Sequence, residues 1–237
     1  MASLYPLKFN EKLAFFYNTV AATLWFCCLG RFLILLPLVG RKFLPGGMAD
    51  FFHVVSLLPI IESLFVKSVL RKKFTITSLW GILNGLKMVW LCYGVIFPHP
   101  KIAKHTSYSL LITSWCLQYF IHYFYYAFKV KTKSSFHFLF WLEYNNFYLT
   151  YPLGLVSEMI LLFLSLAFVE QDSIYDYVLR AAFLAYIPIA YFAWGHLKSR
   201  KKKRYTEIMN KRNVRQVATL ESTTTSTKNT SIELRNM

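Results

Sequence analysis

Long apolar segments constrain this sequence more than any other feature. Six blocks of mostly apolar residues follow one another, at 13–39, 48–70, 75–97, 107–129, 147–169 and 175–197. A transmembrane helix needs about 20 such residues to cross roughly 30 Å of hydrocarbon, and each block reaches that length. In lipid, a single segment can satisfy its own backbone hydrogen bonds only as a helix. The sequence therefore predicts an all-α, polytopic membrane protein with a bundle of six transmembrane helices.

The composition excludes the main alternatives to that fold. The chain is 56% hydrophobic and only 16% charged, whereas a soluble domain has roughly 45–50% apolar and about 25% charged residues. The apolar blocks are also too long and too continuous for the alternating strands of a membrane barrel. A soluble globular domain and a β-barrel are therefore both unlike this sequence.

Basic residues predict the orientation, because cytoplasmic loops of membrane proteins are enriched in Lys and Arg. They gather after the second, fourth and sixth blocks, while the alternate loops are poorer in them. The cytoplasmic set is Lys67, Arg71, Lys72, Lys73, Lys129, Lys131, Lys133, Lys198 and the run Arg200–Arg204. Both termini are therefore expected in the cytoplasm.

Three regions follow from this organisation. Residues 1–12 form a cytoplasmic N-terminal segment, 13–197 the six-helix membrane domain, and 198–237 a tail that is basic at first, then rich in Ser and Thr and predicted to be disordered. The tail holds 11 basic and 3 acidic residues, so it contributes +8 of the net charge of +16. A basic run directly after a membrane helix is typical of a topology signal that touches anionic lipid, so membrane lipids are the expected partner and nucleic acid is not.

Ionisable residues inside apolar blocks are costly, which makes them candidates for function. They are Arg31, Glu62, Lys87, His122, Glu143, Glu158 and Arg180. The sequence shows neither metal-site spacing nor a Gly-rich phosphate loop, so we expect no cofactor and no metal.

Glu158 is the strongest of these candidates. Tyr151 precedes it by seven residues, which places the two on one helix face, two turns and roughly 10 Å apart. Pro152 suits the first turn of a helix, and Gly154 leaves space between the phenol and the carboxyl group. The pair can hold a substrate between them. The alternative is structural, with the carboxyl group bonded to a neighbouring helix.

The sequence resembles a known family along most of its length, roughly residues 14–204. The pieces that carry the resemblance are Tyr17-Asn18 and Trp25; Ile60-Ile61-Glu62 with Lys72 and Thr77; Trp115, Tyr123 and Tyr126; Leu142-Glu143-Tyr144, Phe147 and Tyr151-Pro152-Leu153-Gly154 through Glu158; and Ala185-Tyr186-Ile187-Pro188, His196 and Arg200-Lys201-Lys202. In this order they resemble the very-long-chain (3R)-3-hydroxyacyl-CoA dehydratase family, also called protein tyrosine phosphatase-like. No phosphatase loop of the Cys-x5-Arg kind is present.

The resemblance implies a site and a reaction. The family's catalytic Tyr and Glu fall on Tyr151 and Glu158, and Lys72, Lys73 and Gly154 become candidate substrate-binding residues. The implied reaction removes water from a very-long-chain (3R)-3-hydroxyacyl-CoA to give a trans-2-enoyl-CoA, the third step of fatty acid elongation in the endoplasmic reticulum membrane. Glu158 is assigned to proton abstraction and Tyr151 to activation of the oxygen, although the two roles can be exchanged. Other elongation enzymes are the implied protein partners.

Several positions depart from the family pattern. They are Gly81 and Gly85 in the third helix, Tyr119 and His122 in the fourth, and Glu143, which stands where the family has Arg. Lys87 is a candidate substitute for a lost polar group of the third helix. These departures favour a divergent member, and the alternative is a weakened or inactive relative that acts as a membrane scaffold for elongation enzymes.

Unpaired charges are expensive in lipid, so the altered network predicts new pairings. We expect Glu143 to reach the cytoplasmic interface or to pair with His122 or a loop lysine. We expect Glu62 to pair with a hydroxyl or a cation of another helix, with Arg31 and Lys87 as the candidate cations.

Overall fold

A computed structural model describes residues 8–41, 43–66, 76–132, 136–169 and 173–233, and within these ranges it contains helices and no strand. The helices are α1 (Phe9–Val39), α2 (Leu44–Val55), α3 (Leu58–Ile61), the π-helical η1 (Glu62–Val66), α5 (Ile76–Val89), the π-helical η2 (Trp90–Ile96), the short 3-10 helix η3 (Ile102–Lys104), α6 (Thr106–Thr132), α7 (His137–Asn145), α8 (Phe147–Leu166) and α9 (Ile174–Glu233). The predicted all-α class is confirmed.

Five stretches of the described residues are long and apolar enough to cross a membrane. They are Phe9–Val39, Leu44–Leu64, Leu79–Ile96, His137–Leu166 and Ile174–Asn210, so the chain is a multi-pass membrane protein. The remaining predicted block, 107–129, lies within α6, which has 27 residues and is therefore about 40 Å long. The Tyr, Ser, His and Gln side chains of α6 lower its mean hydropathy, and α6 is not among the five apolar stretches. Its length is the property that fits a span.

The second predicted span is not one straight helix. α2 ends at Val55, α3 begins at Leu58, and the chain then changes to π-helical geometry from Glu62 to Val66. Pro59 is the second residue of α3, and its ring removes one backbone donor and excludes a carbonyl of the preceding turn. The interruption therefore follows from the proline.

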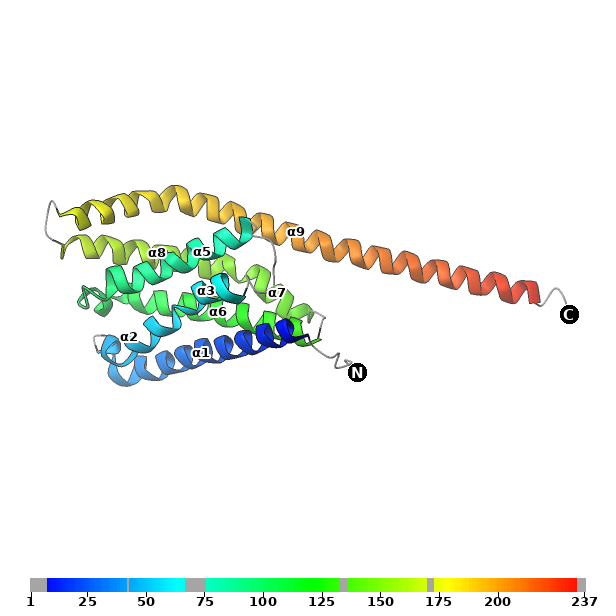
Figure 1. Ribbon diagram of the computed structural model, residues 1–237, viewed down its shortest axis with the longest axis horizontal. Coiled ribbons are helices and arrows are strands. Elements are labelled where there is room, and N and C mark those ends of the chain that lie inside the picture. Colours follow the sequence, from blue (N-terminus) through cyan, green and yellow to red (C-terminus); the bar gives the residue numbers. More distant parts are fainter. Residues whose placement is uncertain (1–7, 42, 67–75, 133–135, 170–172, 234–237) are drawn as a thin grey trace. The chain divides into compact units, whose positions relative to one another are not determined.

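α6 is the central helix of the bundle formed by residues 1–188 (Figure 1). It packs most extensively against α1 on one side and against α8 on another. Aromatic rings fill the interior: Trp25 of α1 stacks on Tyr119 with centroids 5.1 Å apart, and Phe52 of α2 stacks on Trp115 at 5.7 Å. These ring contacts pack α6 against both α1 and α2.

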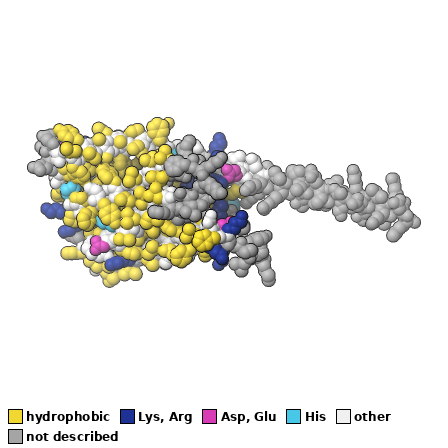
Figure 2. Space-filling model, in the orientation of Figure 1, with side chains coloured by type: hydrophobic (Ala, Val, Ile, Leu, Met, Phe, Trp, Pro, Cys, Tyr) yellow, Lys and Arg dark blue, Asp and Glu magenta, His cyan; other side chains and the backbone are white. Residues whose placement is uncertain are grey.

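The surface of this bundle is apolar rather than polar. Figure 2 shows hydrophobic side chains spread over the bundle, with Lys and Arg near its ends. The large exposed side chains include Leu149, which is 68% exposed, and Phe163, which is 63% exposed. An apolar surface of this extent marks contact with a membrane, as the sequence predicts.

The structure differs from the prediction that the Ser- and Thr-rich residues 219–231 are disordered. α9 continues as helix to Glu233, and by its contacts the chain divides into the units 1–188 and 189–237. The stretch 196–218 has neither Pro nor Gly and is rich in Lys, Arg and other good helix formers. Since propagation of a helix is far easier than its nucleation, the helix extends into the Ser- and Thr-rich residues that follow.

Gly85 provides a test of the packing between α3 and α5. A Cβ atom at this position would lie 2.8 Å from both the Cα and the N atom of Ile60, so the two backbones touch here. Gly85→Ala should lower the free energy of unfolding by about 1–3 kcal/mol through overpacking, measured as thermal stability in detergent. Gly30→Ala is the control, because no atom lies within 4 Å of its Cβ. Equal melting temperatures for the two variants would contradict the close approach.

Candidate functional site

The predicted pair Tyr151 and Glu158 lies on α8, although the helix begins earlier than expected. α8 starts at Phe147 and follows α7 through Asn146, whose backbone is itself in the helical region. Pro152 therefore lies inside the helix rather than in its first turn, which corrects that prediction. Pro152 has no N–H and therefore cannot donate the usual helical hydrogen bond to the carbonyl of Tyr148.

The carboxylate of Glu158 is buried and bonded to two other helices. Its side chain is 2% exposed. Lys87 Nζ of α5 donates to Oε1 at 2.9 Å and to Oε2 at 2.8 Å. Trp115 Nε1 of α6 donates to Oε1 at 3.0 Å. The structural alternative for Glu158, a carboxyl group bonded to neighbouring helices, is thus confirmed, and it does not exclude a chemical role.

Tyr151 and Glu158 face the same small internal cavity. It lies between α5, α6 and α8, and about 40 Å³ of it is open to the centre of a water molecule. Each helix contributes polar residues to its lining: Asn84 and Lys87 on α5, Trp115, Gln118 and Tyr119 on α6, and Thr150, Tyr151 and Glu158 on α8. The cavity can therefore present a phenol, a carboxylate and an ammonium group to one small polar centre.

Gly154 lines this cavity and also sets the distance between α6 and α8. A Cβ atom there would lie 3.2 Å from Ser114 Oγ and 3.8 Å from Trp115 Cδ1. The absence of a side chain thus lets α6 come close enough for Trp115 to reach Glu158. Its role in binding substrate stays a prediction.

Sequence reasoning did not identify Asn84 or the bond that Trp115 makes. Asn84 Nδ2 donates to the hydroxyl of Tyr119 at 2.6 Å, which ties α5 to α6 beside the cavity. Asn84 and Lys87 are three residues apart in an otherwise apolar block, so they share a helix face. This spacing was the sequence signal that could have identified Asn84 as a neighbour of Lys87 at the site. Lys72 and Lys73 lie outside the described residues.

A second polar cluster forms around His122. Its Nδ1 atom is 2.9 Å from Glu143 Oε1, and its Nε2 atom is 4.0 Å from Glu62 Oε2. The predicted pairing of Glu143 with His122 is confirmed. Glu62 does face a basic group of another helix, but that group is His122, and neither candidate cation is the partner. Lys87 binds Glu158 instead, and Arg31 lies over the ring of Phe51 at 6.0 Å.

The fold and the site together define a multi-pass helical membrane protein with a buried polar centre on three helices. A sequence profile of the family described as protein tyrosine phosphatase-like protein, PTPLA, matches residues 56–207. The match covers more than half of the chain, and the protein belongs to this family.

Similar proteins carry two kinds of name. The chain is 30% identical over 201 residues to the beta-1,6-glucan synthesis-associated protein KEG1 of Saccharomyces cerevisiae, covering 81% of this chain and 97% of that protein. It is 25% identical over 193 residues to a probable very-long-chain (3R)-3-hydroxyacyl-CoA dehydratase of Schizosaccharomyces pombe, covering 79% and 89%. It is also 25% identical over 174 residues to very-long-chain (3R)-3-hydroxyacyl-CoA dehydratase 1 of Mus musculus, covering 67% and 59%. No solved structure matches the chain.

The ion pair between Lys87 and Glu158 generates a stability prediction. Lys87→Met leaves a buried carboxylate without its cation, which should lower the free energy of unfolding by about 3 kcal/mol. Adding Glu158→Gln to that variant removes the unpaired charge and should recover a large part of the loss. The measurement is thermal unfolding of the purified variants. Additive effects of the two substitutions would show that the pair does not couple α5 to α8.

Proposed function

We propose that this protein removes water from very-long-chain (3R)-3-hydroxyacyl-CoA and forms the trans-2-enoyl-CoA. The observation that carries the proposal is the position of Tyr151 and Glu158, whose side chains line one cavity inside the bundle. Their spacing matches the motif of the dehydratase family, and relatives that align over most of the chain are named as such dehydratases. The reaction is the third step of the elongation cycle, in the endoplasmic reticulum membrane.

The chemistry needs a base for a C2 proton and a proton donor for the departing C3 hydroxyl. Glu158 takes the first role, because a carboxylate held by Lys87 and Trp115 has a fixed position. Tyr151 takes the second, since its phenol can donate to an oxygen. In this scheme Lys87 orients the carboxylate. An elimination transfers no electrons to a cofactor, so the proposal requires none.

The proposal also includes a topology with six spans and both termini in the cytoplasm. In this topology α6 is the fourth span. It lines the cavity together with α5 and α8. The cytoplasmic ends carry the basic residues, including Lys129 and Lys131 at the end of α6. These cations and the basic segment that contains Lys72 and Lys73 are suited to the phosphates of coenzyme A.

A second candidate is a membrane scaffold without turnover that binds elongation enzymes or a related assembly. Its support is specific: both oxygens of Glu158 already accept hydrogen bonds, and the cavity holds about 40 Å³. The family's Arg before helix five is Glu143 here. The relative named as a glucan synthesis-associated protein is aligned over 97% of its length, so a role outside elongation fits the same fold.

Turnover by the purified protein separates these candidates. With a long-chain (3R)-3-hydroxyacyl-CoA and no added cofactor, the wild type should yield the enoyl-CoA. Glu158→Gln and Tyr151→Phe should each reduce kcat by about 100-fold or more, which is the usual contribution of a positioned acid or base. Tyr148→Phe is the control, because Tyr148 lies on the same helix, is 45% exposed and does not line the cavity.

Two outcomes would count against the enzyme. Turnover that is unchanged in both site variants would refute the site. A wild type without turnover that also fails to restore growth to a cell lacking its dehydratase would favour the scaffold.

Glycosylation tags test the topology. A tag inserted in the 170–174 loop should be modified, because that loop faces the lumen in the proposed orientation, and tags at either terminus should stay unmodified. Modified terminal tags, or an unmodified tag in the 170–174 loop, would contradict the proposed orientation.

A further inference from the structure

A long apolar groove lies between α1 and α6, away from the cavity at Glu158. Its volume is about 440 Å³, and its lining comes from matching faces of the two helices: Phe15, Thr19, Ala22, Thr23 and Phe26 of α1, and Phe120, Phe124, Ala127, Phe128 and Lys131 of α6. None of these residues lines the cavity of the candidate site. The groove is therefore a separate feature.

Small residues form the floor of this groove and aromatic rings form its walls. Ala22 and Ala127 are buried at 6% and 7% exposure, whereas Phe26 and Phe124 are 56% and 45% exposed. At the far end, the rings of Phe26 and Phe120 approach to 5.4 Å between centroids. The groove thus opens to the outside of the bundle, where hydrocarbon surrounds a membrane protein.

The groove offers almost no polar group along its length. The hydroxyl of Thr19 donates to the carbonyl of Phe15 at 2.8 Å, and that of Thr23 donates to the carbonyl of Thr19 at 3.0 Å. Both threonines therefore present their methyl groups to an occupant rather than free donors. An occupant without hydrogen-bonding groups, such as an alkyl chain, fits this lining.

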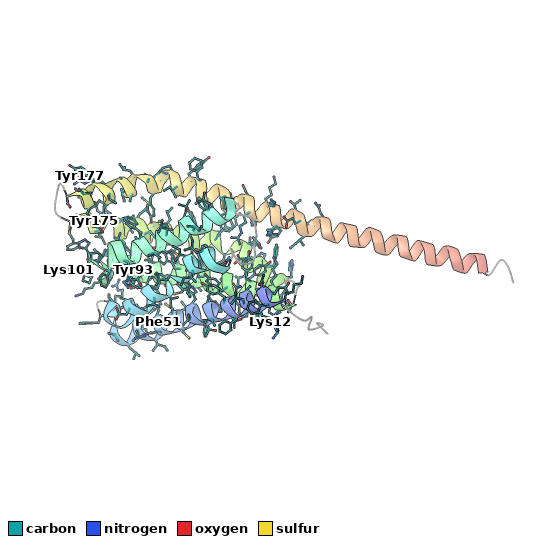
Figure 3. All side chains as sticks on the ribbon, viewed as in Figure 1. Lys12, Phe51, Tyr93, Lys101, Tyr175 and Tyr177 are labelled. Carbon is teal, nitrogen blue, oxygen red and sulfur yellow. The ribbon has the colours of Figure 1, made fainter. Side chains whose placement is uncertain are left out.

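Length and charge identify the occupant more closely. From Phe15 to Phe26 the groove runs eleven residues, or about 16 Å at 1.5 Å per residue, which is close to half of a hydrocarbon core of roughly 30 Å. Lys131 closes one end, with its Nζ atom 5.9 Å from the ring centre of Phe15. Lys12, one turn before Phe15, lies at the same end of the bundle, opposite Lys101 (Figure 3).

We propose that the α1–α6 groove binds one acyl chain of an anionic phospholipid, whose headgroup lies at Lys131 and Lys12. The chain spans one leaflet, and the cations meet the phosphate where the leaflet ends, as anionic lipids meet basic residues next to a span. In the proposed orientation this is the cytoplasmic leaflet. The binding site itself requires neither that orientation nor any turnover at Glu158.

Photocrosslinking in nanodiscs tests the proposal on the full chain. The probes are phosphatidylserine and phosphatidylcholine, each with a diazirine on one acyl chain, and the labelled peptides are mapped by mass spectrometry. Label should concentrate on residues 15–26 and 120–131, with phosphatidylserine at least threefold above phosphatidylcholine. Even labelling over all helices would show an ordinary lipid shell and overturn the proposal.

Two matched pairs of variants sharpen the test. Thr23→Phe fills the groove from its exposed wall and should reduce labelling of both segments at least fivefold, while Val20→Phe, exposed on the same helix but outside the lining, should not. Lys131→Gln should abolish the preference for phosphatidylserine, whereas Lys104→Gln, at the opposite end, should keep it. An unaffected Thr23→Phe would overturn the site.

Competition distinguishes other occupants. Excess phosphatidylserine without the diazirine should displace the label. Displacement by long-chain acyl-CoA but not by phospholipid would instead identify a substrate channel. Crosslinks between two copies of the chain through residues 15–26, in place of lipid label, would identify a dimer interface. Either result would overturn the proposal.

Discussion

The buried ion pair between Lys87 and Glu158 constrains the rest of the bundle. A carboxylate with 2% exposure is tolerated in an apolar interior only when its charge is paired and its oxygens accept hydrogen bonds. The donors come from α5 and α6, and the carboxylate comes from α8. Three helices far apart in the sequence must therefore pack together at the level of Glu158. Glycines allow their backbones to come close enough. Gly154 brings α8 against α6, and Gly85 brings α5 against α3.

The same constraint explains two departures from the family pattern. Gly85, where the resemblance predicts a polar residue, lies where the backbone of α5 touches that of α3, so a long side chain has no room at this position. Glu143 replaces an arginine, and its partner on α6 is His122, which also faces Glu62. A basic group between two carboxylates reverses the usual arrangement without leaving a charge alone in lipid. Each of the two carboxylates thus faces a basic group, as the cost of an unpaired buried charge requires.

The sequence was sufficient for features that depend on one segment or on strong energetic costs. The apolar blocks predicted the helices, and the spacing of Tyr151 and Glu158 predicted a shared face. The cost of a lone carboxylate predicted that Glu143 reaches the interface or finds a partner, with His122 among the candidates. It failed where the answer depends on tertiary packing or propagation. Glu62 does face a basic group of another helix, as expected, but packing decides which group it is: α6 brings His122 near Glu62, and Lys87 binds Glu158 instead. Likewise α9 continues through residues 219–231 because a formed helix propagates, which composition alone does not reveal.

In the proposed reaction Glu158 accepts a proton although the ammonium group of Lys87 is bonded to it, and the hydrogen bonds of its two oxygens differ. Lys87 occupies one position on each carboxylate oxygen, and Trp115 adds a second hydrogen bond to Oε1. A carboxylate oxygen can accept more than one hydrogen bond, so Oε2 has the greater remaining capacity. Of the two oxygens, Oε2 is thus better placed to receive a proton. In the proposed reaction, the ion pair that fixes the position of Glu158 thus also favours Oε2 over Oε1 as the oxygen that receives the proton.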